Sequence, residues 1–471
     1  MESYKLFLAG DFVETVNKIT VTNSYTHETF AEVSVASADD LEIAIVAALK
    51  VEKVMATMPS YQRYDILMHI AGLMKSEKNK LAHVLSTEAC KPLKLAAGEV
   101  DRAIQVFIVA AEEAKRLPKE YLSIDWTVAG AGKEGLVKYF PVGLVAGISP
   151  FNFPLNLAVH KIAPAIAAGC PIILKPSSST PLSTLELAKL IAKTDLPKGA
   201  LSVLPMDRET GNRLVTDERF KLLTFTGSPE VGWKMKTDAG KKKVVLELGG
   251  NAGVIVTPTA DIEKAVAKCV VGGFAFAGQV CIHTQRVFIH KNIFENFAKL
   301  FVEKTKLLKY GPSENPDTDI SAMIDEENAK RVESWVNDAV VGGATLLCGG
   351  KRNEAYYEPT VLTNTKNDMN VCCCEVFGPV VVLEPYENFE QAVKEINDTR
   401  YGLQAGVFTD SIAEMDYAFN NIEVGGLMIN EVPTFRVDHM PYGGVKDSGL
   451  GREGVKYAIL DMLEPRLMVK G

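Results

Sequence analysis

The stretch GLVAGISPFNFPLNLAVHKIAPAIAAGCPIILKPS (143–177) decides the fold. Its two ends, GLVAGISP (143–150) and PIILKPS (171–177), are short apolar runs of the length that is typical of buried strands. The segment between them, LAVHKIAPAIAAG (157–169), is long and apolar enough for a buried helix. Strand, helix and strand in this order indicate a βαβ unit with parallel strands, so the sequence predicts an α/β fold.

The same alternation continues on the C-terminal side of this unit. Further strand and helix patterns follow as LSTLELAKLIAKT (182–194), ALSVLP (200–205), ETGNRLVTD (209–217), KLLTFTG (221–227) and PEVGWKMKTDAG (229–240). A second series begins at VVLELGGNAGVIV (244–256) and continues through helices at 261–277, 292–307 and 388–398 and the strands RVFIH (286–290), GATLLCGG (343–350) and VVVLEPY (380–386). We therefore expect two tandem, doubly wound domains, each built on a parallel sheet.

Two other segments differ from this pattern. Residues 37–117 repeat apolar positions at three- and four-residue intervals, which indicates an N-terminal helical layer. Residues 121–140 alternate around the glycines of AGAGKEG, which predicts two antiparallel strands and a glycine turn. We place the first domain at 1–120 and 139–246 and the second at 247–454. A projecting element then comprises 121–138 and 455–471.

Composition excludes several classes of function. The chain has 471 residues and a net charge of −8, which provides no basic field for nucleic acid. Its first residues do not read as a secretory signal. The most apolar window, 155–174, contains His160, Lys161 and two prolines, which argues against a membrane span.

The eight cysteines show no paired spacing, which favours a reducing cytoplasm over a disulfide framework. Cys372, Cys373 and Cys374 are adjacent, and we expect them in a strand, where their side chains alternate in direction and cannot all reach one ion. With seven scattered histidines and no HExxH, no metal site is expected.

Two glycine-rich strings are set aside as dinucleotide fingerprints. Gly130-x-Gly132-x-x-Gly135 falls in the expected hairpin turn, and Gly449-x-Gly451-x-x-Gly454 has only seventeen residues after it. Neither string opens the βαβ unit that this type of fingerprint requires.

Three residues carry candidate chemistry. Cys281 lies in FAGQVCIHTQR, between a helix and a strand. Glu247 stands at a strand end in LELGG, where a general base could reach a substrate. Asn152 follows a strand in SPFNFP, where its amide could donate to an oxyanion.

The ordered set SPFNFP, FTGS, LELGG, GQVC, EVFGP and PYGGVKDSGLGREG resembles the aldehyde dehydrogenase superfamily over nearly the whole chain. Within it, 151–169 and 435–458 are similar to the lactaldehyde dehydrogenases of archaea and bacteria. The resemblance implies that the Cys281 thiolate attacks an aldehyde, and that Asn152 and the Cys281 N–H hold the oxyanion. Glu247 would then hydrolyse the thioester; members that transfer the acyl group to coenzyme A lack this glutamate.

The resemblance also implies a nicotinamide cofactor and the positions that bind it: Ser149, Phe151, Lys175, Ser178, Gly211, Gly227, Ser228, Gly232, Leu248, Glu375 and Phe377. In the family the pyrophosphate lies at the N-terminus of the helix that contains Gly232. Where relatives usually carry a ribose-binding carboxylate, KPSS has Ser178. NADP is therefore admissible beside NAD.

Three positions suggest the substrate class. His160 falls eight residues after Asn152, and Arg436 and His439 lie in a loop whose family counterpart borders the substrate mouth. An arginine there would favour an anion, although Arg436 could equally be a solvated or intersubunit residue and His439 a packed one. We expect a small hydroxylated or anionic aldehyde, with lactaldehyde first and sulfolactaldehyde, a semialdehyde or a sugar-derived aldehyde behind it.

The C-terminal LEPRLMVKG alternates like an exposed edge strand. With the expected hairpin, this segment resembles the family's oligomerisation element, which implies a homodimer or homotetramer. In the family's terms, the first domain would bind the cofactor and the second would be catalytic. The alternative to an enzyme is a non-catalytic relative that keeps the fold.

Overall fold

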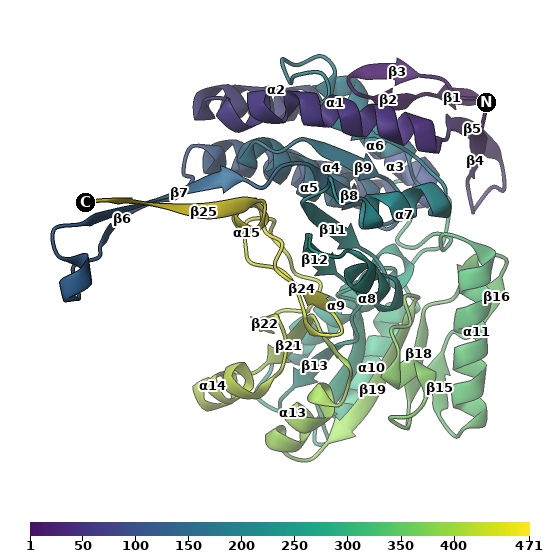
Figure 1. The fold of residues 1–471 in the computed structure, drawn as a ribbon. Helices are drawn as coiled ribbons and strands as arrows, with labels where there is room; N and C mark the ends of the chain where they lie inside the picture. Colours follow the sequence, from purple (N-terminus) through teal and green to yellow (C-terminus); the bar gives the residue numbers. More distant parts are fainter.

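Two mainly parallel sheets organise the chain, one in the upper half of Figure 1 and one in the lower half. The structure is a computed structural model that describes residues 1–471. The predicted α/β class with two parallel-sheet units is confirmed. Strands β12 (Lys243–Glu247) and β13 (Ala252–Val256) belong to different sheets, so the chain passes from one half to the other within residues 248–251.

The first sheet has eight strands in the order β24-β12-β11-β8-β9-β10-β2-β3. Its parallel centre is formed by β8 (Val145–Ile148), β9 (Ile172–Lys175), β10 (Leu201–Val203), β11 (Leu222–Thr226) and β12. Antiparallel strands close its edges, namely β2 (Leu6–Leu8), β3 (Asp11–Val13) and β24 (Gly449–Leu450). The carboxyl ends of the central strands therefore all open at one edge.

The second sheet has seven strands in the order β15-β18-β19-β14-β13-β21-β22. Six are parallel: β13, β14 (Thr284–His290), β18 (Thr360–Thr363), β19 (Val380–Tyr386), β21 (Gln404–Phe408) and β22 (Gly426–Ile429). The antiparallel strand β15 (Thr345–Cys348) lies at one edge. Small pairs flank this half: β16 (Arg352–Asn353) with β17 (Tyr356–Tyr357), and β20 (Tyr401–Gly402) with β23 (Val445–Lys446).

Helices cover both sheets. The predicted N-terminal helical layer is confirmed as α1 (Ala38–Thr57), α2 (Ser60–Ser76), α3 (Lys78–Ala89) and α4 (Leu93–Ala114), beside a small sheet of β1 (Glu2–Tyr4), β5 (Thr29–Ser34) and β4 (Lys18–Thr22). The first half also contains α5 (Pro154–Ala168), α6 (Leu182–Ile191), α7 (Arg208–Thr216) and α8 (Pro229–Asp238). The second half contains α9 (Ile262–Phe274), the 3-10 turn η2 (Ala275–Gly278), α10 (Phe294–Thr305), α11 (Glu326–Val341), α12 (Asn370–Cys373), α13 (Phe389–Asn397) and α14 (Ile412–Asn421).

Helix α5 is buried along its whole length, because it packs between the first sheet and α2, α4 and α6. This explains the apolar window at 155–174, whose three charged or polar exceptions, Asn156, His160 and Lys161, are themselves buried. No helix in the structure has both the length and the apolar character needed to cross a bilayer.

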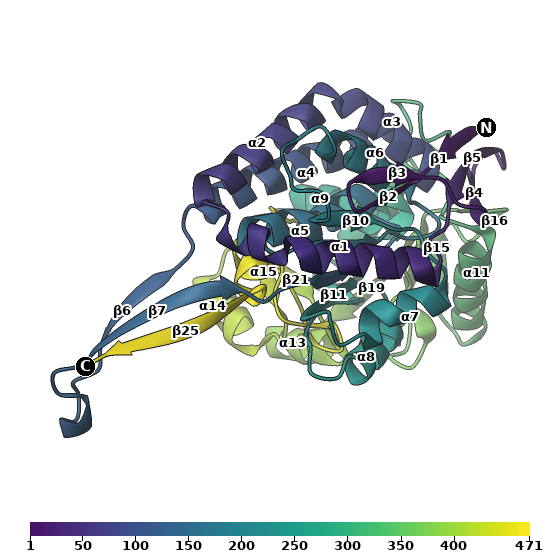
Figure 2. The same ribbon diagram turned by 45° about the horizontal axis from the view of Figure 1, so that its top comes forward.

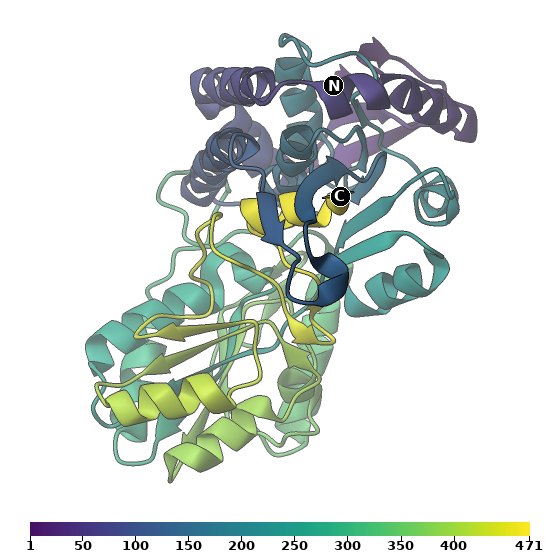
Figure 3. The same cartoon turned by 60° about the vertical axis from the view of Figure 1, so that its left-hand side comes forward.

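A long hairpin projects from the body, as Figures 1 and 2 show; in Figure 3 it points toward the viewer. Its strands are β6 (Lys119–Ser123) and β7 (Glu134–Pro141), and the turn between them contains the short 3-10 helix η1 (Val128–Gly130). The predicted antiparallel pair is confirmed. The C-terminal strand β25 (Leu463–Lys470) pairs with β7 along its full length, so its other edge is the free one.

Two expectations differ from the structure. Strand β24 falls in the range assigned to the second domain but extends the first sheet, and helix α15 (Val455–Asp461) packs on α4 and α5 rather than in the hairpin. The strand expected for Cys372–Cys374 is wrong: Cys372 and Cys373 lie in the single turn α12. The run follows Met369 and Asn370, whose main-chain carbonyls accept its N–H groups in helical fashion.

Candidate active site

The strand ends of the first half and loops of the second half meet at one cleft of about 550 Å³. Strands β8 and β11 end beside it, β12 ends in it at Glu247, and the loop after η2 delivers Cys281. The predicted residues that line this cleft are Phe151, Asn152, Gly227, Ser228, Glu247, Leu248, Cys281, Glu375 and Phe377. Residues far apart in sequence are therefore brought together in one site.

The backbone around Cys281 is held by close contacts. Phe276 and Ala277 in η2 both have left-handed backbone angles, with φ of 51° and 53°. Gly278 continues this turn at φ +69°, and a Cβ there would lie 2.1 Å from the Gly378 carbonyl oxygen. A Cβ on Gly250 would meet the Cys281 carbonyl oxygen at 2.2 Å. The glycines of GQVC and LELGG are thus required for the close approach of these loops.

The Asn152 side chain contacts the main chain of the loop that carries Cys281. Its Nδ2 donates to the Gln279 carbonyl at 3.0 Å, and its Oδ1 accepts from the Phe153 N–H at 3.1 Å. An amide nitrogen carries two hydrogens, so one N–H remains for a ligand in the cleft. The side chain is therefore oriented by both of its bonds.

Glu247 is the most isolated of the three groups. Its side chain is buried, and neither carboxylate oxygen has a hydrogen-bond partner in the protein. Burial raises the pKa of Glu247 well above its usual value, and the Glu453 carboxylate raises it further. An unpartnered carboxyl group of raised pKa in a cleft is suited to general acid–base chemistry.

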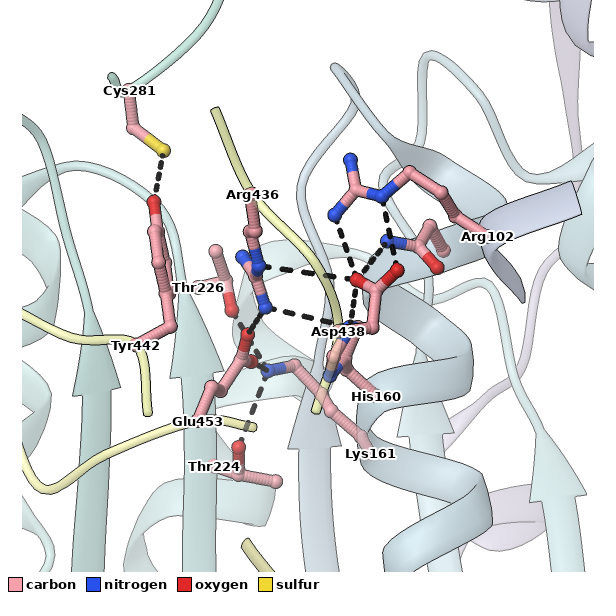
Figure 4. Close-up of polar contacts among 11 residues, drawn as sticks. Arg102, His160, Lys161, Thr224, Thr226, Cys281, Arg436, Asp438, Tyr442 and Glu453 are labelled. Atoms are coloured by element: carbon pink, nitrogen blue, oxygen red, sulfur yellow. Dashed lines mark hydrogen bonds and ion pairs between the residues drawn. The ribbon is translucent and has the colours of Figure 1, made fainter. Parts of the chain in front are cut away.

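The Cys281 thiol faces Tyr442 rather than Glu247. Its Sγ lies 3.0 Å from the Tyr442 hydroxyl, as Figure 4 shows. Burial raises the pKa of Cys281 to about 11, whereas the bond to Tyr442 acts in the opposite direction. The hydroxyl therefore favours the thiolate, the reactive form of a cysteine.

The side of the cleft where we expect a cofactor to bind is formed by α8 and Glu375. Ser228 is the N-cap of α8 but makes no side-chain cap bond, so the first-turn N–H groups can donate hydrogen bonds to an anion. Glu375 accepts from the Gly250 N–H at 3.0 Å, and a Cβ on Gly249 would lie 2.2 Å from its Oε2. Burial raises the pKa of Glu375 to about 7. This arrangement fits a dinucleotide.

Aromatic and aliphatic side chains complete that wall. Phe377, with φ of 46°, meets Phe151 edge-on at 5.7 Å between ring centroids. The Leu248 side chain occupies the space beside Gly232, where a Cβ would lie 2.4 Å away. A glycine at 232 therefore lets α8 approach the LELGG loop.

Four other predicted cofactor residues lie outside the cleft lining. Lys175 ends β9, and its methylenes lie 3.2 Å from where a Cβ on Gly211 would be. Ser178 is exposed, three residues beyond the same strand end. Ser149 is buried and its hydroxyl has no partner in the protein.

The three predicted substrate residues are placed differently from one another. Arg436 lines a second, smaller pocket of about 60 Å³ that shares Cys281 and Glu247 with the main cleft. His160 is buried behind it, with Nε2 2.8 Å from Asp438 and 3.4 Å from Arg436. His439 is exposed and lines neither pocket.

A buried ionic network around Arg436, which Figure 4 shows, was not predicted from the sequence. Arg436 donates to Glu453 at 3.0 Å, and Lys161 lies 3.5 Å from the other oxygen of Glu453. Arg102 binds both oxygens of Asp438, at 3.0 and 2.7 Å. The charged pair His160-Lys161 inside an apolar helix was the available signal, because buried charges require partners.

A model of the family described as "Aldehyde dehydrogenase family" matches residues 12–468. A 3-sulfolactaldehyde dehydrogenase of Priestia aryabhattai is 44% identical over 470 residues, covering 100% of this chain and 98% of that protein. A lactaldehyde dehydrogenase of Methanococcus aeolicus is 39% identical over 471 residues, covering 98% of this chain and 99% of that protein.

Solved structures agree with this match. Aldehyde dehydrogenase 21 from Physcomitrella patens, in complex with the reaction product succinate, has a TM-score of 0.98 and 46% identity, covering 100% of this chain and 98% of that one. The glyceraldehyde-3-phosphate dehydrogenase GapN of Methanocaldococcus jannaschii, complexed with NADP, has a TM-score of 0.93 and 39% identity, covering 97% and 100%. The chain therefore belongs to the aldehyde dehydrogenase family and is an oxidoreductase that uses a nicotinamide dinucleotide.

Proposed function

We propose that this site oxidises a small aldehyde with an anionic group to the carboxylic acid, with Cys281 as nucleophile, Asn152 as oxyanion donor and Glu247 as base. The observation that carries the mechanism is that these three residues line one cleft. In the first step the Cys281 sulfur attacks the carbonyl carbon, and the carbonyl oxygen gains the negative charge.

The developing oxyanion needs donors that are already in place. The free N–H of the Asn152 amide and the main-chain N–H of Cys281 supply them. The bond from Asn152 to the Gln279 carbonyl keeps the amide aimed before substrate arrives. Pre-orientation matters because donors that need not reorganise stabilise the charge most effectively.

The cofactor site is formed by Gly227, Ser228, the first turn of α8, Glu375 and Phe377. A nicotinamide held by these residues would supply the acceptor for the hydride that leaves the substrate carbon. Lys175 and Ser178, at the end of β9, are proposed to face the adenosine. Because Ser178 lacks a carboxylate, we propose that NADP is accepted as well as NAD.

The acyl group then remains on Cys281 as a thioester. Glu247 removes a proton from a water molecule as that water attacks the thioester carbon, and the acid is released. Its lack of any other partner leaves both oxygens available for this water. Glu247 therefore favours hydrolysis over transfer of the acyl group to coenzyme A.

The substrate class rests on two arginines in the smaller pocket. Arg102 uses Nε and Nη2 to bind Asp438, and Arg436 uses Nη2 to bind Glu453 while its Nε makes no hydrogen bond and lies 3.9 Å from Asp438. Both guanidinium groups therefore retain donors for a sulfonate or carboxylate. Sulfolactaldehyde and succinate semialdehyde carry such groups, whereas lactaldehyde offers only a hydroxyl. We propose that His160 orients Asp438 and that His439 does not contact the substrate.

The test compares initial rates with sulfolactaldehyde, succinate semialdehyde, lactaldehyde and hexanal, each with NAD and NADP. Arg102→Gln should raise KM for the two anionic aldehydes about 10-fold or more, with little change for lactaldehyde. Arg116→Gln, which removes an exposed arginine paired with Glu113, is the matched control. Hexanal as the best substrate, or equal effects of Arg102→Gln on all four, would contradict the anionic class.

Assembly and compartment are part of the same proposal. The hairpin and β25 leave a free strand edge with exposed Leu467, Met468 and Val469, which favours pairing with another copy in a homodimer or homotetramer. All eight cysteines are free, which suits a reducing cytoplasm.

A further inference from the structure

The Cys281 sulfur has a single hydrogen-bond partner in the protein, the Tyr442 hydroxyl. Tyr442 is 3% exposed, and its main chain pairs with Glu453 in an antiparallel bridge. Its ring also lies under the Arg436 guanidinium, 3.7 Å from the centroid. The side chain is therefore held by its main-chain bridge and by Arg436, with its hydroxyl aimed at the sulfur (Figure 4).

The chemistry of this contact is set by which atom carries the hydrogen. Burial raises the pKa of Tyr442 well above 10, so the phenol keeps its proton throughout the working range of an enzyme. It is then a donor, and the acceptor is the sulfur. A donor to an ionised sulfur makes a charge-assisted bond, which is stronger than a bond to the neutral thiol.

We propose that Tyr442 is a catalytic residue whose hydroxyl donates to the Cys281 sulfur and increases the fraction of the nucleophile that is ionised. This inference rests on the proposed function, because it takes Cys281 as the nucleophile. Attack moves the charge from sulfur to the carbonyl oxygen, where Asn152 stabilises it. The Tyr442 bond therefore acts before and during the attack on the aldehyde, and not after it.

Other charged groups around the sulfur do not replace this bond. The carboxylates of Glu375 and Glu247 raise the pKa of Cys281, and only Arg436 among the charged groups lowers it. Arg436 makes a hydrogen bond to Glu453 and none to the sulfur. Burial has the largest effect and disfavours the thiolate. Tyr442 is therefore the main protein group that favours ionisation.

The test measures alkylation of Cys281 by iodoacetamide across a pH series, in the full-length protein. The Cys281→Ser variant gives the alkylation of the other cysteines, which is subtracted. Tyr442→Phe keeps the ring under Arg436 and removes only the donor. We expect the midpoint of the alkylation profile to move to higher pH and the rate near neutral pH to fall about 3- to 10-fold. The burst of reduced cofactor should slow in parallel.

Tyr386→Phe is the matched control, because Tyr386 is also buried and its hydroxyl donates to the Val256 carbonyl at 3.3 Å, away from the site. It should leave the alkylation midpoint unchanged. A fluorinated tyrosine at position 442, a more acidic donor of nearly the same size, should move the midpoint to lower pH. This shift in the opposite direction still tests the proposal if Tyr442→Phe fails to fold.

An alkylation midpoint that is unchanged in Tyr442→Phe, or one unmoved by the fluorinated side chain, overturns the proposal. Failure of the proposed function gives a different result, since Cys281→Ser would then retain aldehyde oxidation. If Cys281→Ser still oxidises aldehyde, Cys281 is not the nucleophile. If Cys281→Ser is inactive but the alkylation profile of Tyr442→Phe is unshifted, only the role of Tyr442 is refuted.

Discussion

Lys91 donates a hydrogen bond from its buried ammonium group to the main-chain carbonyl of Asn152. The same ammonium pairs with Glu99 and lies 3.8 Å from the ring centroid of Phe153 and 4.4 Å from that of Phe276. Glu99 in turn accepts from the N–H groups of Leu155 and Asn156, both at 3.1 Å. One buried ion pair thus connects the Asn152 loop to the turn that precedes Cys281.

Lys91→Met should both destabilise the protein and misplace Asn152. Removing one partner leaves Glu99 buried and unpaired, which costs about 3–5 kcal/mol of unfolding free energy. We expect hydride transfer to slow about 10- to 100-fold through loss of orientation, as single-turnover kinetics would record. The double variant Lys91→Met/Glu99→Gln should recover part of the stability but not the rate.

Lys94→Met, three residues on and 48% exposed, is the control for this pair. Its ion pair with Asp319 lies near the surface, so we expect less than about 1 kcal/mol of change in unfolding free energy. Equal losses in the two lysine variants would show that Lys91 has no special role.

The sequence allowed the fold and the chemical centre to be predicted because both depend on local patterns. Alternating strand and helix signals from 143 onward predict the sheets, and Asn152, Glu247 and Cys281 stand in short strings at strand or helix ends. The partners Tyr442, Glu453 and Arg102 could not be assigned in this way. Their roles arise from contacts across hundreds of residues, as Arg102 with Asp438 illustrates.

Substrate residues were the weakest prediction for the same reason. The position of His160 after Asn152, and that of Arg436 and His439 in one loop, suggested a shared substrate site, but a loop's course decides which side chains point inward. The turn at 436–440 directs Arg436 and Asp438 inward and leaves His439 exposed. Likewise β24 returns to the first sheet through an antiparallel pairing with β12, which no local pattern at 449–450 indicates.

Cys281→Ser should lower aldehyde oxidation by roughly a thousandfold or more, because a hydroxyl without a dedicated base is a far poorer nucleophile. Binding of the dinucleotide, measured by fluorescence titration, should persist, since α8 and Glu375 are untouched. Cys269→Ser, a buried cysteine in α9, is the control and should remain active. Comparable loss in both variants would assign the effect to folding.

Glu247→Gln should separate the two halves of the reaction. The thioester can form but lacks its base, so we expect one burst of reduced cofactor per site and then steady turnover lowered about 100- to 10,000-fold. Stopped-flow absorbance shows both phases. Steady turnover equal to that of the wild type would remove Glu247 from the hydrolytic step.

The raised pKa of Glu247 also predicts a pH-dependent stability. Above pH 4.5, the ordinary value for this group, the unfolded chain loses the proton while the folded chain keeps it. Folding then takes up a proton, so this contribution to stability is greatest at low pH and falls as pH rises toward the folded-state pKa. Relative to Glu247→Gln, the wild type should therefore lose unfolding free energy with rising pH in denaturant titrations.

Ser178→Glu tests the choice of dinucleotide. A carboxylate at the end of β9 would repel a 2′-phosphate and accept the ribose hydroxyls of NAD, so KM for NADP should rise about 10-fold or more relative to that for NAD. Ser76→Glu on the exposed face of α2 adds the same charge elsewhere and should change neither value. If the ratio of kcat/KM with NADP to that with NAD stays constant, another residue recognises the phosphate.

The free edge of β25 predicts how the protein assembles. Leu467 and Val469 are about half exposed and lie two apart on the strand, so their side chains share one face. Replacing both with lysine places like charges along any edge that pairs with a second copy, which should weaken association strongly. Sedimentation should then show the 51.3 kDa chain as a monomer, whereas the wild type remains oligomeric. Val16→Lys is the control and should also remain oligomeric, because Val16 is 98% exposed and lies far from the hairpin in sequence. A monomeric wild type, or an oligomer that survives both lysines, would show that assembly does not use this strand.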